Sequence, residues 1–382
     1  MSADAHAVDS ASPLATPWQW IRDNAWIAAW WLGGRALVFV TALVVRTIGV
    51  HGYAVSNASR HAFGLLGGWD GIWYRRVASD GYLLIPGRQS DPAFFPLYPL
   101  LLRGMHVLGA GYQSAGLLLS NLALLGALVA VAALTRELFG ATLARRTTVY
   151  VAIFPLGYVF SMAYPESVVL GAIALAGLAA LRGHWTAAAL CAAAAALARP
   201  EGVFVALPVL ACAWRRRRSM SPFERGVALG AICAPVAALA SYPLYLGSVL
   251  HDPLAWSQAE RSWGRAFSPL GFVGTIVHLP HAVAGTPWLL RDVAAFILYA
   301  ALLVAARRAG TPPAWLAGAV AVVALPVFSG SFESIGRFGL LALPVFWGLA
   351  WVGRNPVADR AIRGAAIVLL PALTATIPFV FP

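Results

Sequence analysis

The sequence has little charge and no lysine. Only 11% of its 382 residues are charged, all 27 positive side chains are arginine, and 60% of the residues are hydrophobic. A soluble domain carries about 25% charged residues, so a soluble protein of two or three domains is excluded. The absence of lysine reflects genome composition more than function. The net charge of +12 does not predict nucleic-acid binding, because the arginines lie between apolar runs and no basic soluble domain is present.

Cysteine is also scarce. Cys191, Cys212 and Cys233 lie within apolar segments and lack the spacing of metal ligands. Neither a disulfide framework nor a metal site is therefore predicted. The chain contains no P-loop, G-x-S-x-G, H-E-x-x-H or C-x-x-C motif, and no G-x-G-x-x-G in a suitable context. Nothing indicates a soluble nucleotide-sugar domain, and we expect no cofactor.

Long apolar runs dominate the chain. A membrane-spanning helix needs about 20 mostly apolar residues. The candidates number about eleven, and the third to sixth are short and crowded: 30–50, 113–134, 148–163, 166–182, 185–199, 201–214, 226–249, 292–306, 313–329, 338–353 and 362–381. We therefore predict an all-α fold, a polytopic transmembrane helical bundle of about 11 spans.

The arginines predict the orientation of this bundle. The run "WRRRR" at 214–218 is typical of a cytoplasmic anchor, and the short turns on the other side carry few arginines. Residues 1–17 are small, polar and acidic, which predicts a disordered cytoplasmic tail. Residues 18–382 are expected to form a single transmembrane domain, with the tryptophan-rich stretch 18–31 as an interfacial helix that leads into the first span.

Two segments, 51–112 and 251–291, are too long and too polar to be turns, and both fall on the outer face. Loops longer than about 12–15 residues are usually functional or disordered. These two are rich in tryptophan, tyrosine, phenylalanine and proline, which argues against disorder. We expect two long extracytoplasmic loops that contain amphipathic helices.

The stretch "GGWDGIWYRRVASDGY" (67–82) opens the first outer loop. Trp69, Trp73 and Val77 recur at helical spacing, Asp70 occupies an N-cap position, and Gly81 ends the helix. One interpretation is a short helix on the membrane that Asp70 merely caps. The other is a carboxylate held in a fixed orientation, able to accept a proton from a sugar hydroxyl. The two interpretations are compatible.

Acidic residues mark the short outer turns. "AYPES" contributes Glu166, "ARPEG" contributes Glu201 beside Arg199, and "GSFESIGRF" contains Glu333 and Arg337. These charges either meet water at helix ends or line a polar cavity between them. In a cavity, the arginines could bind a phosphate, because a guanidinium group matches phosphate oxygens in a fork.

The second outer loop contains "HDPLAWSQAERSWGRAF" (251–267), with Gln258, Arg261 and Arg265. This mixture of arginine and tryptophan suits a lipid-phosphate headgroup. A helix lying on the membrane surface would have the same composition, so both interpretations stay open.

Taken together, these motifs resemble the PIG-V-type mannosyltransferases of the GT-C superfamily. The resemblance covers roughly residues 30–350. It rests on the order of six segments: "WDGIWYRRVASDGY", "AFFPLYPLLLR", "FPLGYVFSMAYPESVVL" (154–170), "LARPEGVF" (197–204), "HDPLAWSQAERSWGR" and "SIGRFGLLALPVF" (334–346). Such enzymes are polytopic and take sugar from a polyprenyl phosphate on the non-cytoplasmic face. The Ala-rich, all-Arg chain resembles a bacterial member.

The resemblance implies that Asp70 is the catalytic base of the first loop. It also points to substrate-binding positions. Together with residues of the two outer loops, the candidate substrate-binding residues are Trp69, Arg75, Glu166, Ser167, Arg199, Glu201, Gln258, Arg261, Arg265 and Arg337. Several related families have a D-x-D-like pair of acids in the first loop. This chain lacks one, which disfavours a metal-bridged donor.

The predicted function is inverting transfer of a hexose, mannose by resemblance, from a polyprenyl monophosphate sugar to a lipid-linked or cell-envelope acceptor. The predicted site is on the extracytoplasmic side of a bacterial plasma membrane. Arg199, Arg337 and Arg261 are the candidates for stabilising the leaving phosphate. The alternative is a polytopic lipid or solute transporter, for which buried arginines and broken helices would also be suitable. The partners expected are these lipids and the bilayer, not nucleic acid.

Overall fold

The computed structural model describes residues 17–49 and 63–382, and every regular element within these ranges is a helix. The all-α prediction is confirmed for this part of the chain. All but the last residue of the predicted tail 1–17 lie outside the described residues. So does the segment 50–62 at the start of the first predicted outer loop.

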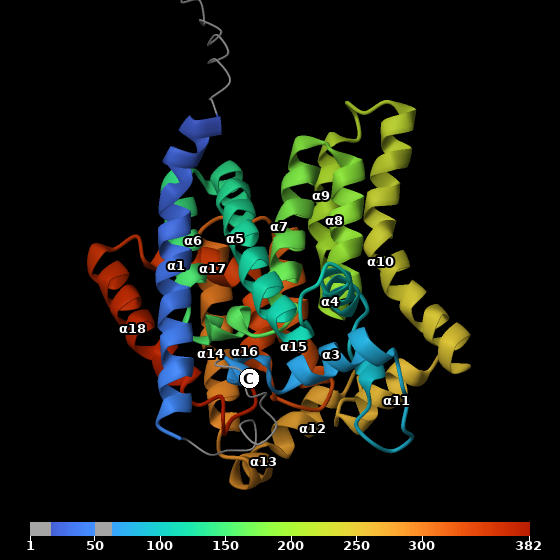
Figure 1. The fold of residues 1–382 in the computed structure, drawn as a ribbon. Coiled ribbons are helices and arrows are strands. Elements are labelled where there is room, and N and C mark those ends of the chain that lie inside the picture. Colours follow the sequence, from blue (N-terminus) through green and yellow to red (C-terminus); the bar gives the residue numbers. More distant parts are fainter. Residues whose placement is uncertain (1–16, 50–62) are drawn as a thin grey trace, which may run out of the picture.

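Helices from along the whole described sequence form the main bundle (Figure 1). They are α1 (Pro17–Thr47), α5 (Tyr112–Phe139), α6 (Ala141–Ile153), α7 (Glu166–Arg182), α8 (Trp185–Ala198), α9 (Ala206–Arg216), α10 (Pro222–Leu250), α14 (Leu289–Arg308), α15 (Pro313–Phe328), α17 (Leu343–Val352) and α18 (Pro356–Thr374).

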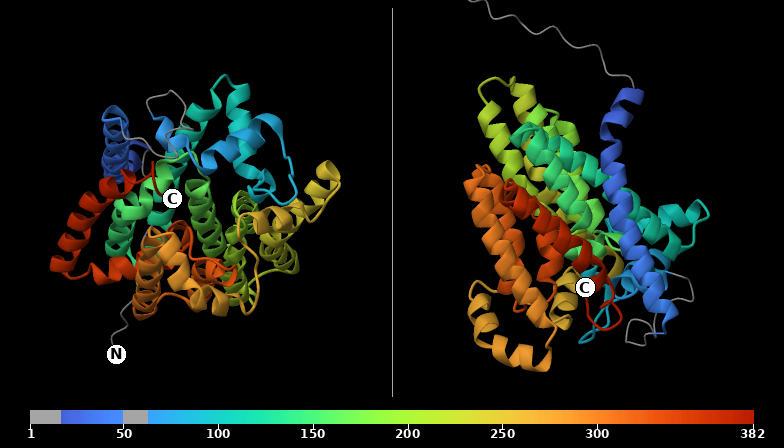
Figure 2. Two further views of the ribbon diagram at one scale, coloured as in Figure 1. Left: turned by 90° about the horizontal axis from the view of Figure 1, so that it is seen from below. Right: turned by 90° about the vertical axis from the view of Figure 1, so that its left-hand side faces the viewer.

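Shorter helices connect them. They are η1 (Gly64–Gly67), α3 (Asp70–Asp80), η2 (Asp91–Ala93), α4 (Leu97–Val107), η3 (Pro155–Ser161), η4 (Pro200–Val205), α11 (Ala255–Ser262), α12 (Gly271–Val277), α13 (Leu279–Gly285), α16 (Ile335–Phe338) and η5 (Gly339–Leu341). Helices α3 and α11 to α13, from the two predicted outer loops, gather at one end of the bundle, opposite the α9–α10 turn (Figures 1 and 2).

Each predicted span contains a helix, but the count of about eleven spans is not confirmed. In the described part of the chain, four helices are long and apolar enough to cross a membrane: Arg22–Thr47, Tyr112–Phe139, Pro222–Leu250 and Leu289–Arg308. Two bent pairs raise the number to six if each pair is one span. Helices α6, α8 and α9 have 13, 14 and 11 residues, fewer than the roughly 20 that a span requires. Eleven spans therefore stay a prediction.

The tryptophan-rich stretch 18–31 is helical and leads into the first predicted span, and its placement at the membrane interface stays a prediction. These residues belong to α1, which runs without a break from Pro17 to Thr47. No proline or glycine interrupts the stretch before Gly33. Local composition therefore continues the helix into the first span.

The two bent pairs place irregular backbone inside the bundle. Helices η3 and α7 meet at 99°, and the segment Ile335–Leu341 meets α17 at 84°. Backbone groups released at such breaks need partners within the protein. The buried Arg35 of α1 donates hydrogen bonds to the carbonyl groups of Ala152 and Gly157 and to Ser161 Oγ, at 2.7–3.1 Å. This arginine therefore stabilises the first break.

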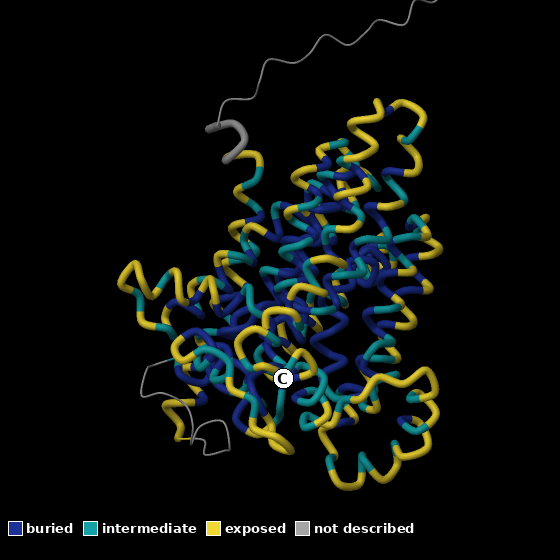
Figure 3. Tube along the Cα trace, turned by 90° about the vertical axis from the view of Figure 1, so that its right-hand side faces the viewer, coloured by how far each residue is buried: buried dark blue, intermediate teal, exposed yellow. Residues whose placement is uncertain are grey.

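Small residues let the central helices pack closely. Helix α8 packs against α7 and α10, and its Ala188, Ala192 and Ala195 are fully buried. Alanines at this spacing share one face of a helix and allow neighbouring backbones to approach. Buried stretches run through the middle of the bundle, and the turns at its ends are exposed (Figure 3). The rigid centre thus fixes the positions of the helix ends.

Candidate functional site

Helix α3 fixes the carboxylate that the sequence singled out. Asp70 is the first residue of the helix, and Trp69, with φ of +51°, occupies the N-cap position, so the predicted capping role of Asp70 is wrong. The N–H of Asp70 donates to Tyr164 Oη at 3.1 Å, and the residue is only 6% exposed. A non-glycine residue at positive φ is strained and persists only where its surroundings enforce it. Gly81 ends the helix as predicted.

The side chains of α3 do not form the predicted apolar stripe of Trp69, Trp73 and Val77. Tyr74 and Val77 are buried against the protein, whereas Trp69 and Trp73 are partly exposed and line a cavity. The indole N–H of Trp69 donates to the carbonyl group of Ile377 at 2.8 Å. The tryptophans are therefore available to contact a ligand.

Two Pro-Glu turns supply further carboxylates. Glu166 follows Pro165 at the start of α7, and Glu201 follows Pro200 at the start of η4. Proline suits the first turn of a helix, and free N–H groups there favour a negative charge. Both carboxylates are buried. The repeated dipeptide thus directs two acids from different helices to the same end of the bundle.

These acids and two arginines form one buried network. Arg337 Nη1 lies 2.5 Å from Asp70 Oδ2 and 3.9 Å from Glu166 Oε1. Arg199 Nη1 lies 2.6 Å from the same Glu166 oxygen, and its Nε lies 3.0 Å from Glu201 Oε2. Asp70 and Arg337 are 267 residues apart in the sequence. Groups from four distant segments therefore converge, as expected for a functional site built at helix ends.

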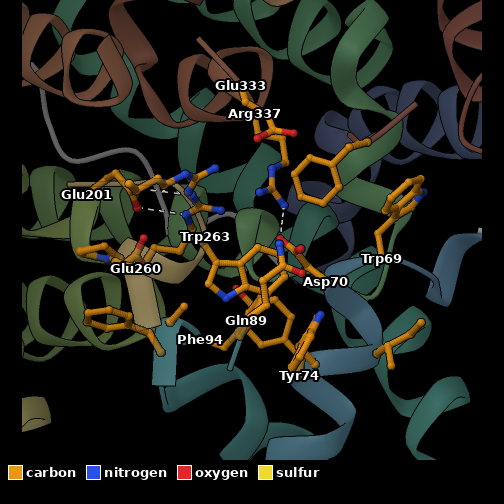
Figure 4. A pocket seen from close by; sticks show the side chains of 18 of the residues that line it. Trp69, Asp70, Tyr74, Gln89, Phe94, Glu201, Glu260, Trp263, Glu333 and Arg337 are labelled. Carbon is orange, nitrogen blue, oxygen red and sulfur yellow. Dashed lines mark hydrogen bonds and ion pairs between the residues drawn. The ribbon is translucent and has the colours of Figure 1, made fainter. Parts of the chain in front are cut away.

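A cavity of about 390 Å³ lies beside this network. Asp70, Arg199, Glu201 and Arg337 line it, together with aromatic side chains (Figure 4): Trp69, Trp73, Tyr74, Phe94, Trp263 and Phe381. Aromatic walls combined with a few convergent polar groups are typical of a ligand-binding site. Within the described residues, no hydrogen bond reaches Asp70 Oδ1. That oxygen could therefore accept a hydrogen bond from a ligand.

A second cavity of about 430 Å³ adjoins the first, and it is lined mainly by apolar side chains, including Phe204 of η4, Trp256 of α11 and Phe267. The cavities share Pro200, Glu201, Glu260 and Arg265. Arg265 donates to Ser334 Oγ at 3.3 Å, and its guanidinium carbon lies 5.5 Å from the ring centre of Phe338. None of the carboxylates that the structure describes forms an ion pair with Arg265 within 4.0 Å.

Glu260 forms no ion pair within 4.0 Å in the described part of the chain, in contrast to the acids of the network. Burial raises the pKa of this carboxyl group, although the nearby Arg265 lowers it. Burial dominates because desolvation disfavours the charged form. Glu260 therefore retains its proton at a higher pH than an exposed glutamate does.

Three predicted site residues lie outside both cavities and outside the ion-pair network. Arg75 donates to Gln113 Oε1 at 2.7 Å, Ser167 donates to the carbonyl group of Phe160 at 3.2 Å, and Gln258 donates to Asp252 Oδ2 at 2.7 Å. Each therefore has a local structural partner. Arg261 lines only the second cavity. The remaining candidates, Trp69, Asp70, Glu166, Arg199, Glu201, Arg265 and Arg337, line the first cavity or belong to the ion-pair network.

Sequence reasoning missed four residues that complete the site. Tyr164 contacts Asp70, Ser334 accepts hydrogen bonds from two arginines, and Glu260 and Phe381 line the first cavity. The first three lie inside segments that were already singled out, "AYPES", "GSFESIGRF" and "WSQAERSWGR". Phe381 carried no signal, because its position depends on how the chain packs after α18.

The described residues contain no group of three or more histidine, cysteine, aspartate or glutamate side chains placed to hold a metal ion. The carboxylates of the network are instead engaged by arginines. The site offers carboxylates and guanidinium groups beside a cavity with aromatic walls.

No family model matches the chain, and no curated protein does. Among solved structures, it is similar to the archaeal oligosaccharyltransferase AglB from Archaeoglobus fulgidus in complex with an inhibitory peptide and a dolichol-phosphate. The identity is 14% and the TM-score 0.45, over 93% of this chain and 56% of that chain. The chain is also similar to the Archaeoglobus fulgidus oligosaccharyltransferase tethered with an acceptor peptide. Here the identity is 13% and the TM-score 0.47, over 94% of this chain and 56% of that chain. The chain thus spans little more than half the length of these structures.

Proposed function

We propose that the chain is an integral membrane glycosyltransferase. It moves a hexose, mannose in the first instance, from a polyprenyl monophosphate sugar to a lipid-linked or cell-envelope acceptor at the extracytoplasmic face of a bacterial plasma membrane. The observation that carries the proposal is the convergence of Asp70, Arg337 and Arg265 on one aromatic-lined cavity. The ordered motifs that resemble PIG-V-type mannosyltransferases support it.

Asp70 acts as the general base. Arg337 holds Oδ2 at 2.5 Å, so Oδ1 faces the acceptor hydroxyl. The hydroxyl oxygen forms a bond to the anomeric carbon while its proton passes to Asp70. The bond between the anomeric carbon and the phosphate oxygen breaks, and the electron pair leaves with polyprenyl phosphate. Attack in line with the leaving group inverts the anomeric centre.

The leaving phosphate binds at Arg265. The predicted phosphate ligands Arg199 and Arg337 are engaged by buried carboxylates, whereas Arg265 lies where the polar and the apolar cavity meet. A phosphate there leaves its sugar in the first cavity and its first isoprene units in the second. Arg261, which lines the second cavity, is placed to assist. Guanidinium groups stabilise the phosphate charge as it develops.

The test uses purified protein in nanodiscs, polyprenyl phosphate carrying radiolabelled mannose, and a membrane-lipid extract as acceptor. The wild type is expected to yield a labelled glycolipid. Asp70→Asn should lower the rate by about 100-fold or more, since a general base contributes at least that much. Asp80→Asn, which alters the exposed acid at the other end of α3, is the matched control and should keep full activity. Equal rates for the two variants would refute the assignment of the base.

A transporter is the competing function, because the breaks of 99° and 84° resemble the discontinuous helices of transporters. Reconstitution in sealed liposomes distinguishes the two. A transporter would deliver the labelled lipid unaltered to the opposite leaflet, whereas a transferase releases polyprenyl phosphate and a new glycolipid.

A further inference from the structure

The arginine that holds the proposed base stands on a very short element. Arg337 belongs to α16, which has four residues and begins after Ser334, whose φ is +67°. So short a helix has almost no stability of its own, because forming a single turn is unfavourable. The position of Arg337 must therefore be set by the elements that pack against α16.

Helix α14 supplies two hydrogen bonds to the backbone of α16. Asp292 Oδ1 accepts from the N–H of Gly336 at 3.0 Å, and the hydroxyl group of Tyr299 donates to the carbonyl group of Gly336 at 2.7 Å. Asp292 and Tyr299 are two turns apart on one face of α14, and both are buried. They hold the peptide groups on both sides of Gly336, including the one that leads into Arg337.

Glycine is required for this close approach. A Cβ atom at Gly336 would lie 3.2 Å from Asp292 Oδ1 and 3.1 Å from Leu156 Cδ1, and one at Gly339 would overlap the ring of Tyr299. The two glycines thus let α16 lie directly on α14.

A neighbouring residue of α14 extends the contact to a second wall of the cavity. Arg291 Nη2 donates to Asp292 Oδ2 at 2.9 Å and to the carbonyl group of Phe381 at 2.7 Å. The ring of Phe381 lines the cavity and lies 5.1 Å from the guanidinium carbon of Arg337. The ion pair between Arg291 and Asp292 therefore links α16, which carries Arg337, to the aromatic group beside that arginine.

We propose that Asp292 and Tyr299 are positioning residues for the reaction. They contact no substrate but hold α16 so that Arg337 keeps the carboxylate of Asp70 aimed at the acceptor. The expected effect on the reaction rate rests on the proposed transferase function. The two hydrogen bonds that hold α16 do not depend on that function. Loss of either hydrogen bond should lower kcat and leave KM for the donor unchanged, because Arg265, not Arg337, is the proposed phosphate ligand.

The kinetic test compares two isosteric substitutions. Tyr299→Phe removes only the hydroxyl group and is expected to lower kcat about tenfold, with KM for polyprenyl phosphate mannose changed less than twofold. Tyr150→Phe is the matched control. Tyr150 is equally buried, but its hydroxyl donates to Asp359 Oδ1 at 2.5 Å, away from α14 and α16, so kcat should not change. Asp292→Ala should lower kcat further, and Asp292→Asn should restore part of it because the amide oxygen can still accept from Gly336.

Hydrogen exchange measured by mass spectrometry provides a readout without activity. Amides in the segment 332–341 should exchange faster in Tyr299→Phe and Asp292→Ala than in the wild type and in Tyr150→Phe. Unchanged exchange would overturn the proposal, and so would accelerated exchange with an unaltered kcat. If the wild type transfers no sugar while exchange in 332–341 responds as expected, the transferase function fails and the contact between α14 and α16 stands.

Discussion

At the scale of single residues, Arg199 and Arg337 form ion pairs with buried acids, whereas Arg265 forms none within 4.0 Å among the described residues. Arg199 lies between Glu166 and Glu201, and Arg337 is paired with Asp70. Removing one partner of a buried ion pair leaves an uncompensated charge and costs about 3–5 kcal/mol. Arg199 is therefore expected to serve the stability of the site, whereas Arg265 is available for an anionic ligand.

This difference predicts opposite phenotypes for two variants. Arg265→Gln should raise KM for the polyprenyl phosphate donor about tenfold to hundredfold, because a hydrogen bond to a charged group contributes about 1.5–3 kcal/mol, and it should leave Tm nearly unchanged. Arg199→Gln should lower Tm strongly. Donor kinetics and thermal unfolding in detergent measure both effects, and Arg265→Lys should recover part of the affinity. A drop in Tm for Arg265→Gln with normal KM would contradict the assignment.

Glu260 predicts a dependence of stability on pH. Burial raises the pKa of Glu260 in the folded protein. Its contribution to stability is therefore fully present below the unfolded pKa of about 4.3 and is lost as the pH rises through the folded pKa. The Glu260→Gln variant has no carboxyl group at this position, so it should not lose this stability as the pH rises. The Tm of the variant relative to the wild type should increase between pH 4 and pH 8, measured by thermal unfolding at matched ionic strength. A constant difference across this range would show that Glu260 does not titrate with folding.

At the scale of elements, local composition predicted the apolar helices well. Helix α7 spans Glu166–Arg182, the same limits that the sequence predicted, and α8 ends one residue before its predicted limit. The sequence could not show where a helix turns back. The bends at 99° and 84° depend on partners far along the chain, such as Arg35 beside the first break. Similarly, nothing local distinguishes Arg75, which pairs with Gln113, from Arg265, which faces the cavities.

The contact between η4 and α8 predicts a sensitive glycine. A Cβ atom at Gly202 would overlap the carbonyl group of Ala195 and lie 2.6 Å from the backbone nitrogen of Ala196. Gly202→Ala should displace η4 from α8 and lengthen the ion pair between Glu201 and Arg199. The expected loss of stability is about 1–3 kcal/mol. Gly230→Ala in α10 meets no atom within 4 Å and should be neutral or stabilise by up to about 1 kcal/mol. Thermal unfolding compares the two, and an equal response would show that η4 is not held closely.

At the scale of the whole molecule, the bundle has two chemically different ends. The proposed site and helices α3 and α11 to α13 lie at one end, and the arginine-rich turn between α9 and α10 lies at the other (Figure 1). An excess of arginine is typical of cytoplasmic turns. This polarity does not depend on whether the chain crosses the membrane six or eleven times, because it compares only the positions of the two ends.

The orientation can be tested by labelling single cysteines in spheroplasts with a membrane-impermeant maleimide. The background replaces Cys191, Cys212 and Cys233 with alanine, and each test variant adds either Arg88→Cys or Ser219→Cys. Both positions are exposed, one near the site and one in the arginine-rich turn. Arg88→Cys should label in intact spheroplasts, whereas Ser219→Cys should label only after the membrane is opened, because a charged reagent cannot cross the apolar interior. The reverse pattern would place the site in the cytoplasm, where an extracytoplasmic acceptor could not reach Asp70. Labelling of both positions from outside would mean that the two ends of the bundle do not lie on opposite sides of the membrane.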